Sequence, residues 1–329
     1  MLQIAQFGAG RIGQIHASNI AAMKNARLRY VVDVNAEAAA KLASRTGAKV
    51  VTESEAFSDP AVGAVLIASS TDTHARLAIA AARAGKAIFC EKPIDLNLKK
   101  VDDCLAEVNK AAVPMFVGFN RRFDPSFAAL KARLERGEIG ALEQVVITSR
   151  DPAPPPPAYV KVSGGMFRDM TIHDFDMARW LLGEEPVEVF AWGESVVDRK
   201  IAAAGDIDSA MLVLRTASER MCHINNSRRA AYGYDQRIEV FGAKGLLRAQ
   251  NLGATTLEHF TARGTVRDRP LDFFLERYAE AYRAELAAFV GALEDRQPMP
   301  VGAHDGRQAL VLAEAALKSL RSGKPARVS

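Results

Sequence analysis

The sequence predicts an α/β protein with a doubly wound parallel sheet in an N-terminal domain, followed by an α+β domain on a mainly antiparallel open sheet. Over roughly the first 120 residues, short apolar runs alternate with alanine-rich helical segments, as in βαβ units. The later apolar runs are joined by short turn-like links, which is typical of antiparallel pairs. Because 329 residues exceed one ordinary core, we expect two domains, 1–120 and 121–329.

The first domain is expected to hold buried strands connected by helices. The apolar runs that predict strands are Leu2–Phe7, Leu28–Val34, Ala64–Ala68, Ala87–Cys90 and Met115–Phe119. The helical patterns between them are Ile12–Met23, Ala36–Thr46, Thr73–Ala84 and Leu98–Ala111. Each helix then connects two parallel strands by a right-handed crossover.

The second domain is expected to begin with a helix that ends near Arg136 and a strand at Leu142–Ser149. The proline run 152–157 predicts a stiff polyproline II loop, since proline cannot join a sheet interior. The further strands are predicted at Val187–Val197, Ser209–Arg215, Arg220–Asn226, Arg237–Gly242, Leu246–Gln250 and Thr255–Thr261. The further helices are predicted at Asp169–Leu182, Phe273–Glu294 and His304–Ser322.

Composition indicates a globular protein with neither nucleic acid nor a membrane as partner. Lys and Arg number 43 against 39 Asp and Glu, and the charges are interspersed. No uncharged apolar stretch reaches the ~18 residues that span a bilayer, and the N-terminus has the pattern of a first strand. Cys90, Cys104 and Cys222 are odd in number and far apart, so we expect reduced thiols and a cytoplasmic protein. No metal is expected, because no His, Cys and carboxylate set has ligand spacing.

A glycine-rich turn, Gly8-Ala9-Gly10-Arg11-Ile12-Gly13, follows the first strand and opens a helix. Gly8 suits a tight turn, Gly10 allows close approach of a pyrophosphate, and Gly13 allows the helix to pack closely on the strand. Together these three roles define a Rossmann dinucleotide site. Asp33 ends the second strand 20 residues after Gly13. There its carboxylate can accept hydrogen bonds from both hydroxyls of the adenosine ribose. No Arg or Lys stands beside it, which favours NAD over NADP. A turn needed only for packing, with Asp33 as a cap, is the alternative. The expected cofactor-binding residues of this segment are Gly8, Gly10, Arg11, Ile12, Gly13 and Asp33.

A lysine follows the strand Ala87–Cys90, in the tripeptide Glu91-Lys92-Pro93. This position is at the carboxyl edge of the sheet, where open α/β sheets bind ligands. Proline restrains the residue before it to extended angles and so fixes the direction of Lys92. Lys92 can hydrogen-bond a substrate hydroxyl or stabilise an alkoxide. The alternative is a surface lysine paired with Glu91.

Titratable groups at helical spacing follow the flexible pair Gly164-Gly165. On one continuous helix, Asp169, His173 and Asp176 share a stripe that can face a cleft. Asp169 can then orient His173 and raise its proton affinity, as a general base at neutral pH requires. The glycine pair is expected to give the helix start room to approach a substrate. A solvated surface pair is the alternative.

Four motifs resemble, in order and spacing, the glucose-fructose oxidoreductase and inositol dehydrogenase (Gfo/Idh/MocA) superfamily. They are Gly8–Gly13, Glu91-Lys92-Pro93, Gly118–Phe123 and Asp169…His173-Asp174. The likeness covers the whole chain and is greatest to the inositol 2-dehydrogenases of that superfamily, through the stretches Ser149–Pro152, Gly164–Asp176 and Tyr234–Arg237.

The resemblance implies an NAD-dependent dehydrogenase that oxidises a cyclic polyol, with myo-inositol converted to 2-keto-myo-inositol (scyllo-inosose), and usually a homotetramer formed through the open sheets. It also implies a Lys-Asp-His set that handles the hydroxyl proton. Carried over by motif, the catalytic residues are Lys92, Asp169 and His173, the polyol contacts are Asn120, Arg121 and Tyr234, and the further cofactor contacts are Glu91 and Lys92.

Two alternatives remain open from the sequence. One is a related sugar or scyllo-inositol dehydrogenase, which the motifs barely exclude. The other is a non-catalytic redox sensor that binds the dinucleotide and presents its second domain to partners. A sensor has no need of Lys92, Asp169 and His173 together, so the sequence favours an enzyme.

Overall fold

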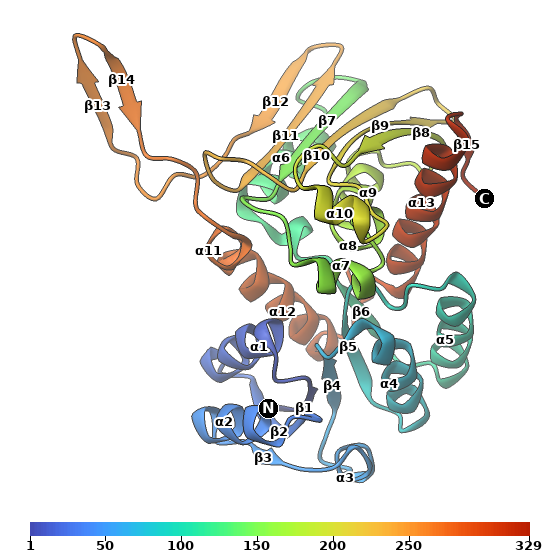
Figure 1. Ribbon diagram of the computed structural model, residues 1–329. Helices are drawn as coiled ribbons and strands as arrows, with labels where there is room; N and C mark the ends of the chain where they lie inside the picture. Colours follow the sequence, from blue (N-terminus) through green and yellow to red (C-terminus); the bar gives the residue numbers. More distant parts are fainter. The chain divides into compact units, whose positions relative to one another are not determined.

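The computed structural model describes all residues from 1 to 329 and divides into two compact units (Figure 1). The first consists of Met1–Asn120 and Ala281–Leu310, and the second of Arg121–Glu280 and Val311–Ser329. The expected boundary at residue 120 coincides with the first change of unit. The expectation did not include the return of residues 281–310 to the first unit. A helical pattern shows that one face is buried, but it does not show which sheet that face covers.

The first unit contains a six-stranded parallel sheet in the order β3-β2-β1-β4-β5-β6. The strands are β1 (Leu2–Phe7), β2 (Ala26–Val32), β3 (Lys49–Val50), β4 (Ala64–Ile67), β5 (Ala87–Glu91) and β6 (Met115–Gly118). The helices are α1 (Arg11–Ala22), α2 (Ala36–Thr46), α3 (Glu53–Ser58), α4 (Thr71–Arg83) and α5 (Leu98–Ala111). In Figure 1, α1 and α2 lie on one side of the sheet and α4 and α5 on the other. Every residue of β4, β5 and β6 is buried, because helices cover both faces of such a sheet.

Helix α12 (Ala279–Glu294) contributes to the core of the first unit through Phe289. The ring of Phe289 packs edge-on against Phe89 of β5 and Phe116 of β6, with centroid distances of 5.6 and 6.0 Å. Phe89 and Phe116 themselves stack at 5.0 Å. All three side chains are fully buried. This aromatic cluster anchors α12 in the core of the first unit.

The second unit contains a seven-stranded sheet in the order β12-β11-β7-β10-β9-β8-β15. The strands are β7 (Leu142–Arg150), β8 (Pro186–Glu194), β9 (Ser209–Thr216), β10 (Met221–Ser227), β11 (Asp235–Gly242), β12 (Gly245–Ala249) and β15 (Ala326–Arg327). The neighbours β7 and β10 are parallel and all other neighbours are antiparallel. Together with the parallel sheet of the first unit, this sheet confirms the predicted fold class.

Helices of the second unit precede and follow its strands. They are η1 (Asn120–Phe123), which starts in the first unit, α6 (Pro125–Glu135), α7 (Pro157–Ser163), α8 (Met166–Asp169), α9 (Thr171–Leu182), α10 (Arg199–Ala203), α11 (Phe274–Arg277) and α13 (Ala303–Ser322), whose residues up to Leu310 belong to the first unit. A hairpin of β13 (Glu258–Thr261) and β14 (Gly264–Arg267) extends away from the rest of the unit (Figure 1). Helix α9 packs against β7 and β10 and covers one face of the sheet.

Two predicted helices are each divided in the structure, and the predicted proline loop ends one residue early. The predicted helix Asp169–Leu182 is two helices, because α8 ends at Asp169 and α9 begins at Thr171. The proline run is followed at once by α7, since Pro157 fits the first position of a helix. The predicted helix Phe273–Glu294 is likewise divided into α11 and α12.

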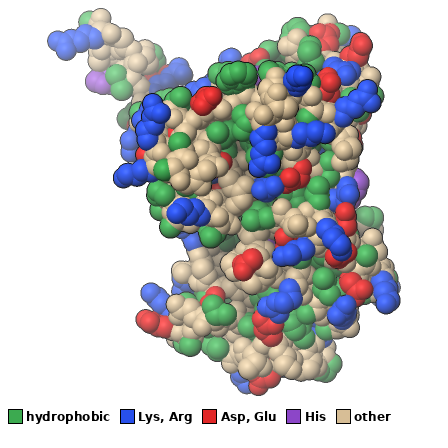
Figure 2. Space-filling view, turned by 45° about the vertical axis from the view of Figure 1, so that its right-hand side comes forward, with side chains coloured by type: hydrophobic (Ala, Val, Ile, Leu, Met, Phe, Trp, Pro, Cys, Tyr) green, Lys and Arg blue, Asp and Glu red, His purple; other side chains and the backbone are tan.

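The surface carries charges of both signs. On the face shown in Figure 2, basic and acidic side chains are interspersed. None of the helices combines the length and the apolar character needed to cross a membrane.

Candidate active site

The glycine turn after β1 has the geometry that each glycine was expected to provide. Gly8 has a φ of +106°, and a Cβ there would lie 2.3 Å from the Ala68 carbonyl oxygen. A Cβ at Gly13 would lie 2.2 Å from the Gly8 carbonyl oxygen. Gly10 differs, because a Cβ there would meet nothing within 4 Å. Gly8 and Gly13 are therefore packing requirements, whereas Gly10 leaves open space at the start of α1.

A buried glutamine fixes this turn. The Nε2 atom of Gln6 donates hydrogen bonds to the carbonyl oxygens of Gly8 and Gly13, each at 2.8 Å. Gln6 belongs to β1 and has no exposed surface. The sequence analysis did not identify Gln6. A polar side chain within an apolar strand could have indicated such a role, because a buried amide needs hydrogen-bond partners.

The acid expected at the end of β2 points to the same turn. One carboxylate oxygen of Asp33 accepts a hydrogen bond from the Ala9 backbone N–H at 2.6 Å, and the other accepts one from the Asn35 N–H at 2.7 Å. The neighbouring Val34 is fully exposed. Asp33 thus holds a negative charge beside the open space at Gly10.

The residues around α1 fit a dinucleotide. Gly10 caps α1 without a side-chain hydrogen bond, so the backbone N–H groups of Arg11 and Ile12 remain available to an anion. The open space at Gly10 admits a pyrophosphate, and Asp33 lies where a ribose acceptor is needed.

Lys92 directly follows Glu91, the last residue of β5, and is partly exposed. The segment after it is held by His74 of α4, whose Nδ1 lies 2.8 Å from the Pro93 carbonyl oxygen. The other ring nitrogen of His74 lies 3.1 Å from the Ser69 carbonyl oxygen. His74 is a second residue that sequence reasoning missed, since its partners come from two different loops.

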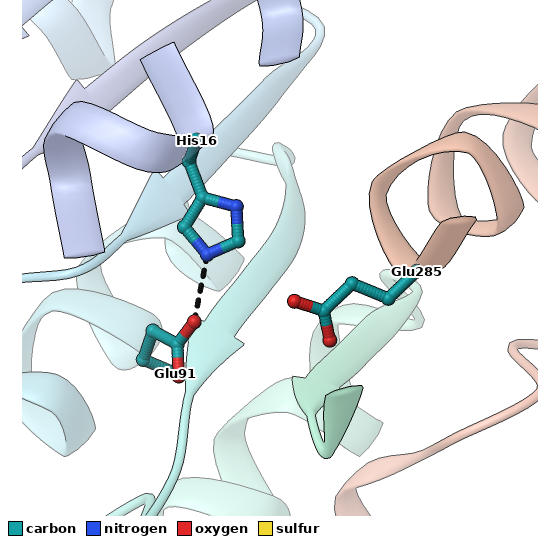
Figure 3. A group of neighbouring side chains, drawn as sticks. All are labelled: His16, Glu91 and Glu285. Atoms are coloured by element: carbon teal, nitrogen blue, oxygen red, sulfur yellow. Dashed lines mark hydrogen bonds and ion pairs between the residues drawn. The ribbon is translucent and has the colours of Figure 1, made fainter. Parts of the chain in front are cut away.

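The carboxylate of Glu91 is directed into the first unit. One of its oxygens lies 2.7 Å from Nε2 of His16 on α1. A Cβ at Gly118 of β6 would lie 3.0 Å from the other oxygen, so the glycine makes room for this side chain. The buried Glu285 of α12 points toward the same pair (Figure 3). Its pKa is raised well above the usual range by burial and by the charge of Glu91. The expected role of Glu91 in cofactor binding therefore stays a prediction, and its side chain is engaged within the domain.

Asp169 and His173 lie on consecutive helices and not on one. Asp169 ends α8 and His173 lies in the first turn of α9, with Met170 between the two helices. The prediction of one continuous stripe is wrong for this reason. His173 is partly exposed, whereas Asp174 to Arg179 are all buried. Within the second unit, His173 is therefore one of the few side chains of α9 that can meet a ligand.

Asp169 is held by two donors of the second unit. Its oxygens accept hydrogen bonds from the Tyr159 hydroxyl at 3.0 Å and from Nη2 of Arg228 at 3.2 Å. Nη1 of Arg228 also lies 3.4 Å from Asp151. Burial raises the pKa of Asp151 to about 6, the charge of Asp169 adds to the rise, and Arg228 opposes it. Sequence reasoning did not identify Arg228 or Asp151 as site residues.

Asp176 does not face a cleft. Its carboxylate is buried and forms a two-fold ion pair with Arg122, at 2.8 and 2.5 Å. The expectation that it shares an open stripe with His173 is therefore wrong. The expected role of the glycine pair before α8 stays a prediction. Gly165 makes room for a side chain of its own unit, because a Cβ there would lie 2.8 Å from Asp206. Asp206 in turn accepts a hydrogen bond from the Met166 N–H at 2.9 Å.

The residues expected to contact a polyol are mostly buried. Asn120 is 2% exposed, and Arg121 and Tyr234 are each 5% exposed. Nη1 of Arg121 lies 2.5 Å from Asp174, and the guanidinium stands over the ring of Tyr278 at 5.7 Å. The ring of Tyr234 packs edge-on against Tyr278 at 6.0 Å. The polyol contacts of Asn120, Arg121 and Tyr234 stay predictions.

The predicted site residues are divided between the two units. The first unit holds Gly8, Gly10, Arg11, Ile12, Gly13, Asp33, Glu91, Lys92 and Asn120, and the second holds Arg121, Asp169, His173 and Tyr234. Within the first, the glycine turn and Asp33 come together through the Ala9 hydrogen bond.

Two family models match the chain. Residues 2–119 match an oxidoreductase family with an NAD-binding Rossmann fold, and residues 127–248 match the GFO/IDH/MocA C-terminal domain. The chain belongs to the GFO/IDH/MocA family of oxidoreductases. As expected from the sequence, the first unit of this GFO/IDH/MocA protein is an NAD-binding domain.

Among characterised relatives and solved structures, GFO/IDH/MocA proteins that act on inositols are prominent. The chain is 49% identical to the myo-inositol 2-dehydrogenase of Thermotoga maritima over 97% of its own length and 96% of the relative's. It is similar to the structure of a myo-inositol dehydrogenase from Corynebacterium glutamicum, with 45% identity, a TM-score of 0.96, and coverage of 100% and 99% of the two chains. It is also similar to a scyllo-inositol dehydrogenase from Lactobacillus casei with bound NAD(H) and scyllo-inositol, with 30% identity, a TM-score of 0.92, and coverage of 100% and 99%.

Proposed function

We propose that the protein is an NAD-dependent dehydrogenase that oxidises myo-inositol to 2-keto-myo-inositol. One observation carries the proposal: nearly the whole chain aligns, at 49% identity, with nearly the whole of a myo-inositol 2-dehydrogenase. The cofactor side is supported by the uncapped start of α1, the open space at Gly10 and the carboxylate of Asp33.

The chemistry uses three side chains. His173, partly exposed on α9, takes the proton of a secondary hydroxyl, and Asp169 orients its ring. Lys92 at the end of β5 holds the same oxygen and stabilises the charge that develops on it. When bound, NAD would supply the acceptor for the hydride that leaves the ring carbon.

Arg228 and Tyr159 support this assignment of Asp169. Both donate hydrogen bonds to its carboxylate, so the side chain has a fixed place although its helix ends there. A charge-assisted bond from a buried guanidinium is stronger than a neutral one. Asp169 is therefore an oriented hydrogen-bond acceptor for the ring of His173 in the proposed reaction.

Initial rates with a panel of substrates test the proposal. The panel contains myo-inositol, scyllo-inositol and several aldoses, each with NAD and with NADP. We expect the highest kcat/KM with myo-inositol and NAD. A higher value with scyllo-inositol or with an aldose would instead support the related dehydrogenases as the function.

The non-catalytic redox sensor makes a different prediction in the same assay. Tight NAD binding with no NADH formed from any polyol would favour the sensor. The family match and the inositol-converting relatives favour the enzyme.

Assembly is proposed to be a homotetramer that uses the open face of the seven-stranded sheet. Side chains on alternate positions of this sheet are large, apolar and exposed, including Trp192, Met211, Val213, Met221 and Phe241. Trp192 lies directly opposite Met211 in the pairing of β8 with β9. Several exposed apolar side chains on one face of a sheet are typical of a subunit contact. Sedimentation equilibrium at several concentrations tests it, and a monomer at every concentration would contradict it.

A cytoplasmic location is proposed from the thiols. Cys90, Cys104 and Cys222 are all buried and free. Unpaired thiols are typical of a reducing compartment.

A further inference from the structure

Three buried side chains from distant segments converge in the first unit. They are His16 of α1, Glu91 of β5 and Glu285 of α12, and their ligand atoms all lie within 4.8 Å of one another (Figure 3). His16 and Glu285 have no exposed surface, and Glu91 is 8% exposed. Neither the fold nor the proposed reaction accounts for two carboxyl groups at this place.

The carboxyl group of Glu285 is the unusual member. Both of its oxygens are buried, and neither has a hydrogen-bond partner. In Figure 3 the group points toward the imidazole of His16 and the carboxylate of Glu91. Buried carboxylates without partners are rare in proteins, because each unsatisfied oxygen has lost its bonds to water. Neither His16 nor Glu91 supplies a hydrogen bond to Glu285, so its carboxyl group calls for a further partner.

Charge and donor chemistry favour a divalent cation as this partner. When both carboxyl groups are ionised, one divalent cation balances their two negative charges, and a neutral imidazole supplies a third ligand. Ligand atoms on one metal, with bonds of about 2.1 Å, lie at most about 4.2 Å apart. The ligand atoms of the three residues lie within 4.8 Å of one another, so they need to approach by only a small amount. The 2.7 Å contact between Nε2 of His16 and Glu91 would lengthen as the metal enters.

We propose that His16, Glu91 and Glu285 form a binding site for a divalent first-row transition metal. One imidazole with two carboxylates suits Zn²⁺ or Mn²⁺ more than Mg²⁺, which prefers oxygen ligands and keeps its waters. The ring of His16 is enclosed by Phe89 and Tyr282, with centroid distances of 5.0 and 5.8 Å. Such an apolar shell strengthens the binding of a cation by fixed ligands.

The ion would connect two segments that matter for the proposed reaction. His16 lies three positions after Gly13 in α1, and Glu91 directly precedes Lys92. Metal binding would connect α1 and the end of β5 to α12 and so hold the end of β5 in place. The role is structural, and it does not place the ion in contact with substrate or cofactor.

Metal analysis of the full-length protein tests the site. The protein is stripped with chelator and dialysed against Zn²⁺, Mn²⁺ or Mg²⁺ in separate experiments, and bound metal is measured by mass spectrometry. We expect about one equivalent of Zn²⁺ or Mn²⁺, little Mg²⁺, and a rise in Tm with the bound metal. In Glu285→Gln the affinity should fall at least about tenfold, since one charged ligand is lost. The matched control is Glu294→Gln, at an exposed position of the same helix.

Infrared spectroscopy distinguishes a bound metal from a protonated Glu285. The difference spectrum between the wild type and Glu285→Gln shows whether Glu285 carries a proton. A protonated carboxyl band that persists in the presence of Zn²⁺ and Mn²⁺, with no bound metal, would overturn the proposal in favour of a proton and a buried water. These readouts do not depend on turnover, so they stand even if no polyol is oxidised.

Discussion

The Nη2 atom of Arg228 donates a hydrogen bond to Oδ2 of Asp169 across 3.2 Å, and the two residues are 59 positions apart. Arg228 is only 4% exposed, and its Nη1 atom lies 3.4 Å from Asp151. A single buried guanidinium thus stands between two acids. Burial alone would lower the pKa of Arg228, but Asp169, Asp151 and Asp206 together raise it. Burial nevertheless raises the pKa of Asp151, because Arg228 offsets only part of the cost of ionising it.

Asp151 gives the second unit a pH-dependent stability. Its pKa is raised from 3.8 to about 6, chiefly by burial. Below pH 3.8 both folded and unfolded states hold the proton, and the stabilisation is fully present. As pH rises through about 6, the folded state must release the proton and the stabilisation is lost. Asn at this position has no proton to release. Asp151→Asn should therefore become more stable relative to the wild type between pH 4.5 and pH 7.5, by about 1–3 kcal/mol.

Urea unfolding of both proteins at the two pH values checks this expectation. Asp72→Asn, at an exposed position of α4, is the matched control and should show no such change. A difference between wild type and Asp151→Asn that is the same at both pH values would show that Asp151 does not titrate in this range.

Lys92 is expected to contribute far more to turnover than to cofactor affinity. Lys92→Ala removes the donor that stabilises the developing charge, so kcat/KM with myo-inositol should fall about 10²-fold or more. The dissociation constant of NAD should change by less than about threefold, because the glycine turn is untouched. Lys110→Ala, at an exposed position of α5, is the control. Near-normal turnover of Lys92→Ala would remove Lys92 from the site.

Most elements of the first domain could be predicted because their signals are local, whereas the short β3 and α3 were not predicted. The strand Leu2–Phe7 and the helices Ala36–Thr46 and Leu98–Ala111 have the expected ends. Each has its periodicity and its caps within a few residues, such as Asn35 before α2 and Asn97 before α5. The glycine turn was predictable for the same reason.

The interior of the site could not be predicted, since its contacts join distant parts of the chain. Gln6 holds the glycine turn through its side-chain amide, and a polar residue does not fit the apolar pattern that predicts a buried strand. His16 and Glu91 are 75 positions apart, and Glu285 comes from the far end of the chain. The break at Met170 was also invisible, because residues on both sides of it have the periodicity of one helix. Fold class follows from local patterns, whereas polar networks follow from tertiary packing.

Cofactor preference is expected to depend on Asp33. Replacing Asp33 with Ser and Val34 with Arg removes a repelling carboxylate and adds a guanidinium that can pair with a 2′-phosphate. The ratio of kcat/KM for NADP to that for NAD should rise at least about tenfold. Val34→Arg alone keeps the hydrogen bonds from Ala9 and Asn35 to Asp33 and serves as the control. An unchanged ratio in the double variant would mean that Asp33 does not contact the ribose.

Gly8 and Gly10 should respond in opposite ways to the same substitution. Gly8→Ala places a methyl group 2.3 Å from a carbonyl oxygen at a φ of +106°, so the free energy of unfolding should fall by about 2 kcal/mol or more. Gly10 has a φ of −69°, which alanine adopts freely, and open space around its Cβ position. Gly10→Ala should therefore fold with its stability unchanged or up to about 1 kcal/mol higher.

The cost of Gly10→Ala should appear only when the cofactor binds. If the open space at Gly10 receives the pyrophosphate, a methyl group there should raise the dissociation constant of NAD at least about tenfold. Urea unfolding without cofactor and fluorescence titration with NADH separate the two effects. A Gly10→Ala variant that binds the cofactor normally would show that the dinucleotide does not approach the chain at this glycine, and the pairing of Asp33 with the turn would then have a structural purpose only.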